Sequence, residues 1–101
     1  MTVKTSRLRV ASQRGADARL VLDNPAYQAA MQAIQQQVVT AWADCSVRDM
    51  EGQKLLLQLH KLTKKFEGLL SGMVETGVLA QLDLDAERDE SKAQKLFRRV
   101  L

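Results

Sequence analysis

The sequence predicts an all-α protein: an antiparallel helical hairpin of two long helices, preceded by a short N-terminal helix and followed by a C-terminal helix. Apolar residues make up 46% of the 101-residue chain but aromatic residues only 4%, a composition typical of helices rather than of a β-sandwich. Two segments also carry apolar residues at alternating steps of three and four, which places them on one helical face. A chain of this length forms one domain with a thin margin of stability, so a partner would help to complete its core.

The N-terminal residues 1–15 show no sustained periodicity, so we expect them to form a flexible basic arm. Gly15 would interrupt any helix that begins in this arm. The apolar run that follows predicts a short helix that ends before Pro25, because the residue before a proline disfavours helical backbone angles. We expect the hairpin domain to span residues 16–80.

The first long helix is predicted to begin at Asn24 and Pro25. Asparagine caps free backbone amides, and proline in the first helical turn gives up only an amide that would have no partner. A capping box from Ser46 to Asp49 predicts a break and then the start of the second long helix near Val47. The apolar stripe of the first helix consists of Tyr27, Met31, Ile34, Val38, Ala41 and Cys45.

The second long helix is predicted to end at Gly77, because glycine adopts the left-handed backbone conformation that terminates helices. The two stripes would cover each other in an antiparallel hairpin. At roughly 1.5 Å per residue the second helix is about 45 Å long and the first about 30 Å, which leaves an overhang around residues 69–78. The main stripe of the second helix consists of Leu55, Leu59, Leu62, Phe66, Leu69 and Met73, and Leu56, Leu70 and Val74 broaden it.

The C-terminal segment, residues 81–101, is predicted to form a charged helix. Its five acidic residues come mostly first and its five basic residues mostly last, which complements the helix dipole. Its apolar residues are too sparse to stabilise an isolated helix, so we expect it to dock or become ordered on a partner.

The overhang is the predicted protein interface. Gly68 and Gly72 lie one turn apart, where small residues let another backbone approach closely. A glycine inside a helix costs about 1 kcal/mol relative to alanine, so we expect a packing reason, either a close crossing within the monomer or self-association. The predicted interface residues are Gly68, Leu69, Gly72, Met73, Val74 and Val78.

Basic residues provide a second candidate surface, for nucleic acid. The net charge is only +3, but five basic residues and one acidic residue fall in the first 19 positions. Arginine forks and lysine patches bind phosphate backbones, whereas a solvated lysine face is the simpler explanation for the lysines. The sequence has neither helix-turn-helix spacing nor an aromatic stacking platform. The candidate contacts are Arg7, Arg9, Arg14, Lys61, Lys64 and Lys65.

Catalytic residues are not recognisable in the sequence. His60 has no carboxylate one turn away, and Cys45 has no partner base. The chain also has no glycine-rich phosphate loop, no Ser-His-Asp arrangement and no metal-ligand cluster. We therefore expect no enzymatic activity, no cofactor and no small-molecule substrate.

The sequence also predicts the compartment. It contains no apolar run of the roughly 18 to 20 residues that span a bilayer and no signal peptide, so we expect no membrane association. A single cysteine cannot form an internal disulfide, which is consistent with a reducing cytoplasm.

Four segments carry a resemblance to a known group of proteins: Ala-Arg-Leu-Val-Leu-Asp-Asn-Pro at 18–25, Ala41-Trp42, Arg-Asp-Met-Glu-Gly-Gln at 48–53, and Met-Val-Glu-Thr-Gly-Val-Leu-Ala at 73–80. The chain from about residue 16 to 80 thereby resembles small helical proteins encoded by tailed bacteriophages. The resemblance implies a location in the virion or the host cytoplasm.

What the resemblance implies about function is a virion structural or assembly component that forms homo-oligomers or docks on a larger virion protein. The alternative is a DNA-binding packaging accessory similar in role to a small terminase subunit. Inhibition of a host enzyme is a third possibility, which no residue favours or excludes.

Overall fold

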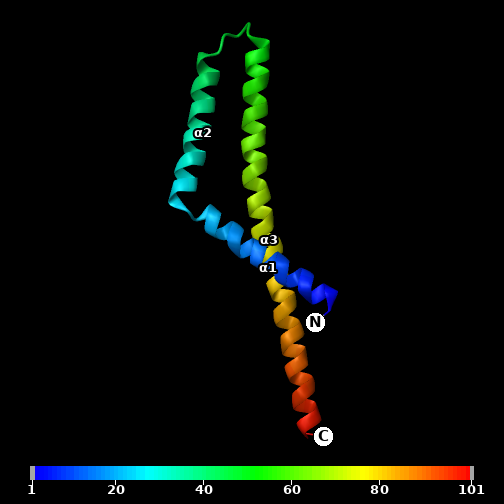
Figure 1. The fold of residues 1–101 in the computed structure, drawn as a ribbon. Coiled ribbons are helices and arrows are strands. Elements are labelled where there is room, and N and C mark those ends of the chain that lie inside the picture. Colours follow the sequence, from blue (N-terminus) through cyan, green and yellow to red (C-terminus); the bar gives the residue numbers. More distant parts are fainter. Residues whose placement is uncertain (1, 101) are drawn as a thin grey trace. The chain divides into compact units, whose positions relative to one another are not determined.

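The computed structural model describes residues 2–100, and every regular element in this range is an α-helix. The helices are α1 (Val3–Leu22), α2 (Pro25–Asp44) and α3 (Met50–Val100), with 20, 20 and 51 residues (Figure 1). The prediction of an all-α protein is confirmed. Met1 and Leu101, at the ends of the predicted arm and of the predicted C-terminal helix, lie outside the described residues.

Helix α2 begins where the sequence predicts. The Asn24 side-chain oxygen accepts hydrogen bonds from the backbone amides of Ala26 and Tyr27, at 2.8 and 3.2 Å. Pro25 occupies the first helical position, where the missing amide costs no hydrogen bond. Both start signals of the sequence therefore act as predicted.

Helix α3 begins three residues later than predicted, at Met50. The Asp49 carboxylate accepts from the amide of Gly52 at 2.9 Å, and its carbonyl accepts from the amide of Gln53 at 3.1 Å, so Asp49 is the N-cap. The Ser46 hydroxyl accepts from the Arg48 amide at 3.2 Å instead. The predicted capping box is wrong because the aspartate caps its own helix rather than reaching back to Ser46.

Two glycines that were predicted to interrupt or end helices lie inside them. Gly15 falls within α1, so residues 3–15 are helical rather than irregular, and Gly77 falls within α3, which continues to Val100. No described glycine has a positive φ, so neither residue uses its conformational freedom to end a helix. The predicted C-terminal helix is thus the last part of α3, because the chain is not broken at Gly77.

The chain divides into two compact units. The first contains residues up to 18 and from 72 onward, and the second contains residues 19–71. These boundaries differ from the predicted 1–15, 16–80 and 81–101, because the first unit combines segments from both ends of the sequence. We describe each unit by itself.

In the first unit, α1 packs against the later part of α3 in the opposite direction. The Thr5 hydroxyl donates to the Glu87 carboxylate at 3.4 Å, and the Ser12 hydroxyl donates to the side-chain oxygen of Gln81 at 2.7 Å. Among the described residues, only small ones are buried at this contact. They are Gly15, Ala18, Gly77 and Ala80.

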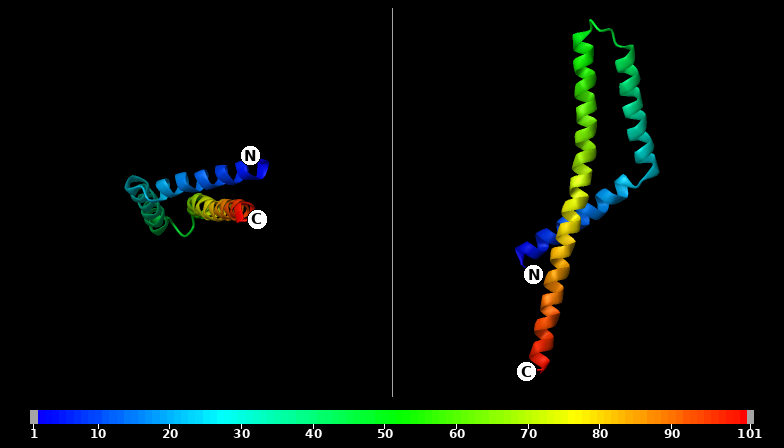
Figure 2. Two further views of the ribbon diagram at one scale, coloured as in Figure 1. Left: turned by 90° about the horizontal axis from the view of Figure 1, so that it is seen from below. Right: turned by 180° about the vertical axis from the view of Figure 1, so that it is seen from behind.

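In the second unit, α2 and the N-terminal half of α3 lie side by side and are joined by the loop at residues 45–49 (Figures 1 and 2). The rings of Tyr27 and Phe66 are 6.3 Å apart, and the Gln35 amide donates to the Glu67 carboxylate at 2.9 Å. Val38 is the buried apolar residue of α2. This unit is therefore held by larger side chains than the first.

The buried row of α3 in the second unit differs from the stripe that the sequence predicts. The residues turned inward are Leu56, Thr63 and Leu70, which are buried or half-buried and spaced seven apart. Their neighbours Leu55, Leu62 and Leu69 are 64%, 64% and 57% exposed. The sequence does not resolve this offset, because α3 is apolar on both rows.

Candidate functional site

The closest approach between helices in the first unit involves Gly15 and Gly77. A Cβ atom added to Gly15 would lie 2.7 Å from the Gly77 Cα and 2.8 Å from the Met73 carbonyl oxygen. A Cβ atom on Gly77 would lie 2.7 Å from the Gly15 Cα and 3.1 Å from the Ala11 carbonyl oxygen. The two backbones therefore touch, and only glycine fits at either position.

Sequence reasoning missed this crossing, although a signal was present. Ala11, Gly15 and Ala18 follow one another at steps of four and three, and Gly77 and Ala80 at a step of three. Small residues at helical spacing form a flat face on which another helix can approach closely. A search for such faces, rather than for helix breakers, would have found the pair.

The glycines of the predicted interface behave differently. A Cβ atom on Gly68 or on Gly72 would meet no atom within 4 Å. Within the described chain, therefore, these two residues do not serve a close crossing. Self-association, the other explanation that the sequence offers for them, stays a prediction.

The other predicted interface residues do not share one face of α3. Leu69 and Met73, one turn apart, are 57% and 39% exposed. Val78 is 56% exposed but lies five residues after Met73, which turns it to another side of the helix. Val74 is half-buried. The structure thus keeps Leu69 and Met73 as one exposed row and separates the two valines from it.

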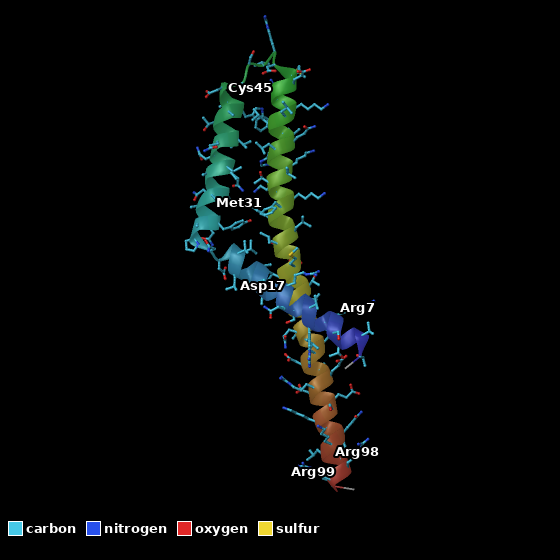
Figure 3. All side chains as sticks on the ribbon, viewed as in Figure 1. Arg7, Asp17, Met31, Cys45, Arg98 and Arg99 are labelled. Carbon is cyan, nitrogen blue, oxygen red and sulfur yellow. The ribbon has the colours of Figure 1, made fainter. Side chains whose placement is uncertain are left out.

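The predicted nucleic-acid contacts fall in both units. Arg7 and Arg14 lie seven residues apart and line a groove on α1 with Val3 and Val10 (Figure 3 labels Arg7). Arg9 lines a different groove, beside α3. The exposed lysines belong to the second unit: Lys61, Lys64 and Lys65. The structure therefore groups Arg7 with Arg14 in one groove on α1, and within the second unit it leaves the three lysines exposed on α3.

A groove of about 300 Å³ runs between α2 and α3 in the second unit. Its lining includes Tyr27, Met31, Gln35, Glu67 and Ser71 (Figure 3 labels Met31). The Tyr27 hydroxyl is buried there without a hydrogen-bond partner among the described residues. Burial of this hydroxyl, and secondly the Glu67 carboxylate, raise the pKa of Tyr27, so the phenol stays neutral and can donate a hydrogen bond.

Cys45 is held at the loop between α2 and α3. Its thiol lies 3.8 Å from an Asp49 carboxylate oxygen and 3.9 Å from the Asp49 carbonyl oxygen. Burial first, and then the charge and hydrogen bond of Asp49, raise the pKa of Cys45. A thiol that stays protonated is a weak nucleophile, and His60, on the exposed surface of α3, has no role in this cluster.

Two features are absent from residues 2–100. No group of three or more His, Cys, Asp or Glu side chains in this range could hold a metal ion. Within the same range, no helix is both long and apolar enough to cross a membrane.

The main candidate site is the apolar surface of α3. The only apolar residues buried in the described chain are Ala18, Val38 and Ala80, and no large side chain there is fully buried. Meanwhile one side of the N-terminal half of α3 exposes a series of leucines and a phenylalanine by 45% to 64% of their surface. They are Leu55, Leu59, Leu62, Phe66 and Leu69.

No protein-family model, no curated protein and no solved structure matches the chain.

Proposed function

We propose that the chain is a non-enzymatic helical interaction protein that acts by assembling through the apolar surface of α3. The observation that carries this proposal is the imbalance between the three buried apolar residues and the row of exposed leucines on α3. Contiguous apolar surface of this kind is typical of protein interfaces, since leaving it in water costs free energy. In this proposal α2 and the N-terminal half of α3 form an antiparallel helical hairpin that presents the surface.

We infer the biological setting from the resemblance of residues 16–80 to small helical proteins of tailed bacteriophages. We accordingly propose a virion structural or assembly component, present in the virion or the host cytoplasm. The chain either forms a homo-oligomer or docks on a larger virion protein. The exposed Leu69 and Met73 and the open Gly68 and Gly72 support a contact on α3.

Light scattering after size exclusion, across a range of salt concentrations, tests this proposal. An apolar contact persists in high salt, because ions screen only the charged interactions. Gly72→Leu should abolish assembly and leave helicity unchanged, since the added side chain meets no atom of its own chain within 4 Å of the Cβ position. Gln36→Leu, which adds the same side chain to an exposed position of α2, is the matched control.

Each outcome changes the proposal in a defined way. Assembly that persists in Gly72→Leu would exclude the glycine face from the contact. A monomer at every concentration and salt would exclude the homo-oligomer and leave docking on a larger protein. Assembly that dissociates on adding salt would favour a charged contact instead of an apolar one.

A DNA-binding packaging accessory is the second candidate function. Arg7 and Arg14 line one groove on the N-terminal helix, and such a pair suits phosphate binding. In an electrophoretic shift assay, affinity should fall steeply with salt, because each phosphate contact releases counterions. The double variant Arg7→Gln and Arg14→Gln should reduce the slope of log affinity against log salt by about 1.8. No shift at low salt would exclude this function.

A further inference from the structure

Helix α3 carries three adjacent rows of side chains in the second unit. We call them the inner, middle and outer rows, and within each row the residues are seven apart, so that they stay on one side of the helix. The inner row is Leu56, Thr63 and Leu70; the middle row is Leu59 and Phe66; the outer row is Leu55, Leu62 and Leu69.

Exposure increases steadily from the inner to the outer row. Thr63 of the inner row is 9% exposed, and Leu56 and Leu70 are half-buried. The middle row is 45% and 50% exposed, at Leu59 and Phe66 respectively. The outer row is 57% to 64% exposed. Helix α2 therefore covers one edge of the apolar face and leaves the other edge open.

The width of this face exceeds what a pair of helices requires. Two helices bury a narrow seam of two rows, whereas a helix that faces the core of a bundle carries a third row. Because α2 covers the inner row, the outer row requires another helix. We propose that this helix is α3 of a second copy of the chain, which packs its outer row against the outer row of the first in the antiparallel direction. This inference rests on the proposed assembly function and names the partner, the row and the direction.

The outer row suits pairing with itself. In a two-fold dimer the same surface of both copies meets, so contacts occur in reciprocal pairs. Because the three leucines are evenly spaced, an axis at Leu62 places Leu62 against its counterpart and Leu55 against Leu69 of the second copy. Three leucine layers form without any change in the helix.

The residues that flank the outer row select the antiparallel direction. One flank is the apolar middle row, and the other carries the exposed Gln58 and Lys65. An antiparallel two-fold axis brings like flanks together, so the middle rows meet each other and Lys65 faces Gln58 of the second copy. A parallel dimer would set Lys65 and Gln58 against Leu59 and Phe66, where a charged group loses water without gaining a partner.

The exposed area is sufficient for a stable dimer. The outer and middle rows together expose on the order of 500 Å² per copy, taking roughly half to two thirds of each side chain. Two copies together therefore offer on the order of 1,000 Å², the total that a specific interface needs. A standard interface buries about 800 Å² per partner.

The first experiment measures the molar mass of the full chain by sedimentation equilibrium over a wide range of concentrations. Leu62→Glu places a charge at the centre of the outer row and should weaken the dimer at least tenfold, because both copies would bury it unpaired. Leu57→Glu is the matched control: Leu57 is also exposed, at 44%, but its position five residues away turns it well off the row. Circular dichroism should show equal helicity in both variants.

The second experiment determines the direction by cysteine cross-linking, in a Cys45→Ser background. In the antiparallel dimer, two cysteines at position 55 lie about 20 Å apart, too far for a disulfide. Leu55→Cys alone should therefore not cross-link, whereas a mixture of Leu55→Cys and Leu69→Cys chains should give a disulfide-linked dimer. Cross-linking of Leu55→Cys with itself would overturn the antiparallel direction.

The outcomes also separate this inference from the proposed function. An oligomer that withstands Leu62→Glu but dissociates in Gly72→Leu would overturn the outer row and retain assembly through α3. A monomer at all concentrations would overturn the second copy as the partner, while docking on a larger protein would still be testable with the same two variants. A dimer lost in Leu62→Glu and kept in Leu57→Glu is the expected result.

Discussion

Two pairs of glycines in this chain have opposite surroundings. Gly15 and Gly77 touch each other through their backbones in the first unit, so that a Cβ atom on either would lie 2.7 Å from the other Cα. Gly68 and Gly72 lie one turn apart on α3 and have nothing within 4 Å of a Cβ position. A glycine inside a helix therefore does not identify a contact by itself; the contact depends on whether a second small residue faces it.

The two units differ in the same way. The first is held by small residues that bring backbones together, and the second by Tyr27, Phe66 and Val38, which keep the helices further apart. A contact between backbones tolerates no added atom, whereas a contact between larger side chains can adjust by changes of rotamer. Substitutions should therefore be most damaging in the first unit.

The largest effect is expected for Gly15→Leu. The new side chain would overlap the backbone at Gly77 and Met73, so the helices must separate, at a cost of about 3 kcal/mol. Hydrogen exchange should show lost protection of backbone amides in residues 3–18 and 72–90, with protection retained in residues 50–65. Gly15→Ala should have a smaller effect in the same direction, because its single Cβ atom is only partly offset by better helix propensity. Unchanged protection in both variants would contradict the close crossing.

A smaller effect is expected for Val38→Ala in the second unit. Val38 is 5% exposed, and removing two methyl groups from a buried site should lower the free energy of unfolding by about 1 to 2 kcal/mol. Val39→Ala, the adjacent residue at 58% exposure, should change it by less than about 0.5 kcal/mol. Urea denaturation followed by circular dichroism measures both. Equal effects would mean that α2 does not turn Val38 toward α3.

In contrast to the preceding variants, Gly68→Ala should raise the free energy of unfolding. The position is open, so alanine adds helix propensity without a clash and should stabilise the free chain by roughly 0.5 to 1 kcal/mol. Gly77→Ala is the paired variant, and it should destabilise. A rise in melting temperature for the first and a fall for the second would establish the contrast between the two glycine pairs. Destabilisation by Gly68→Ala would instead indicate a close contact in an assembled form.

The helix boundaries show how far the sequence can predict this fold. The start of α2 at Pro25 was predictable because Asn24 and Pro25 act on their own helix through local hydrogen bonds. The continuation of α1 through Gly15 and of α3 through Gly77 was not, because it depends on residues about 60 positions apart that meet only in the folded chain. Local signals were reliable where no distant contact competed with them.

The candidate site follows the same rule. Periodicity identified α3 as an apolar helix, and Leu69 and Met73 are indeed exposed on it. Which row α2 covers could not be predicted, since Leu55 and Leu56 are equally apolar and differ only in the direction from which α2 approaches. The offset by one residue decides which leucines are exposed.

The smallest effect concerns Cys45, in the loop that joins the two helices of the second unit. Burial first and Asp49 second raise the pKa of the thiol, so its folded form binds the proton more tightly than the unfolded form. The contribution of this thiol to the free energy of unfolding is fully present below the ordinary cysteine pKa. It is lost as the pH rises through the pKa of the thiol in the folded chain. The rate of alkylation by iodoacetamide should therefore reach half its maximum at a higher pH than in an unstructured peptide.

Asp49→Asn keeps an N-cap residue but removes the charge, so it should shift the midpoint only part of the way back, because burial is the larger cause. A full return to the peptide value would mean that Asp49 alone sets the pKa and that this end of the second unit is open to water.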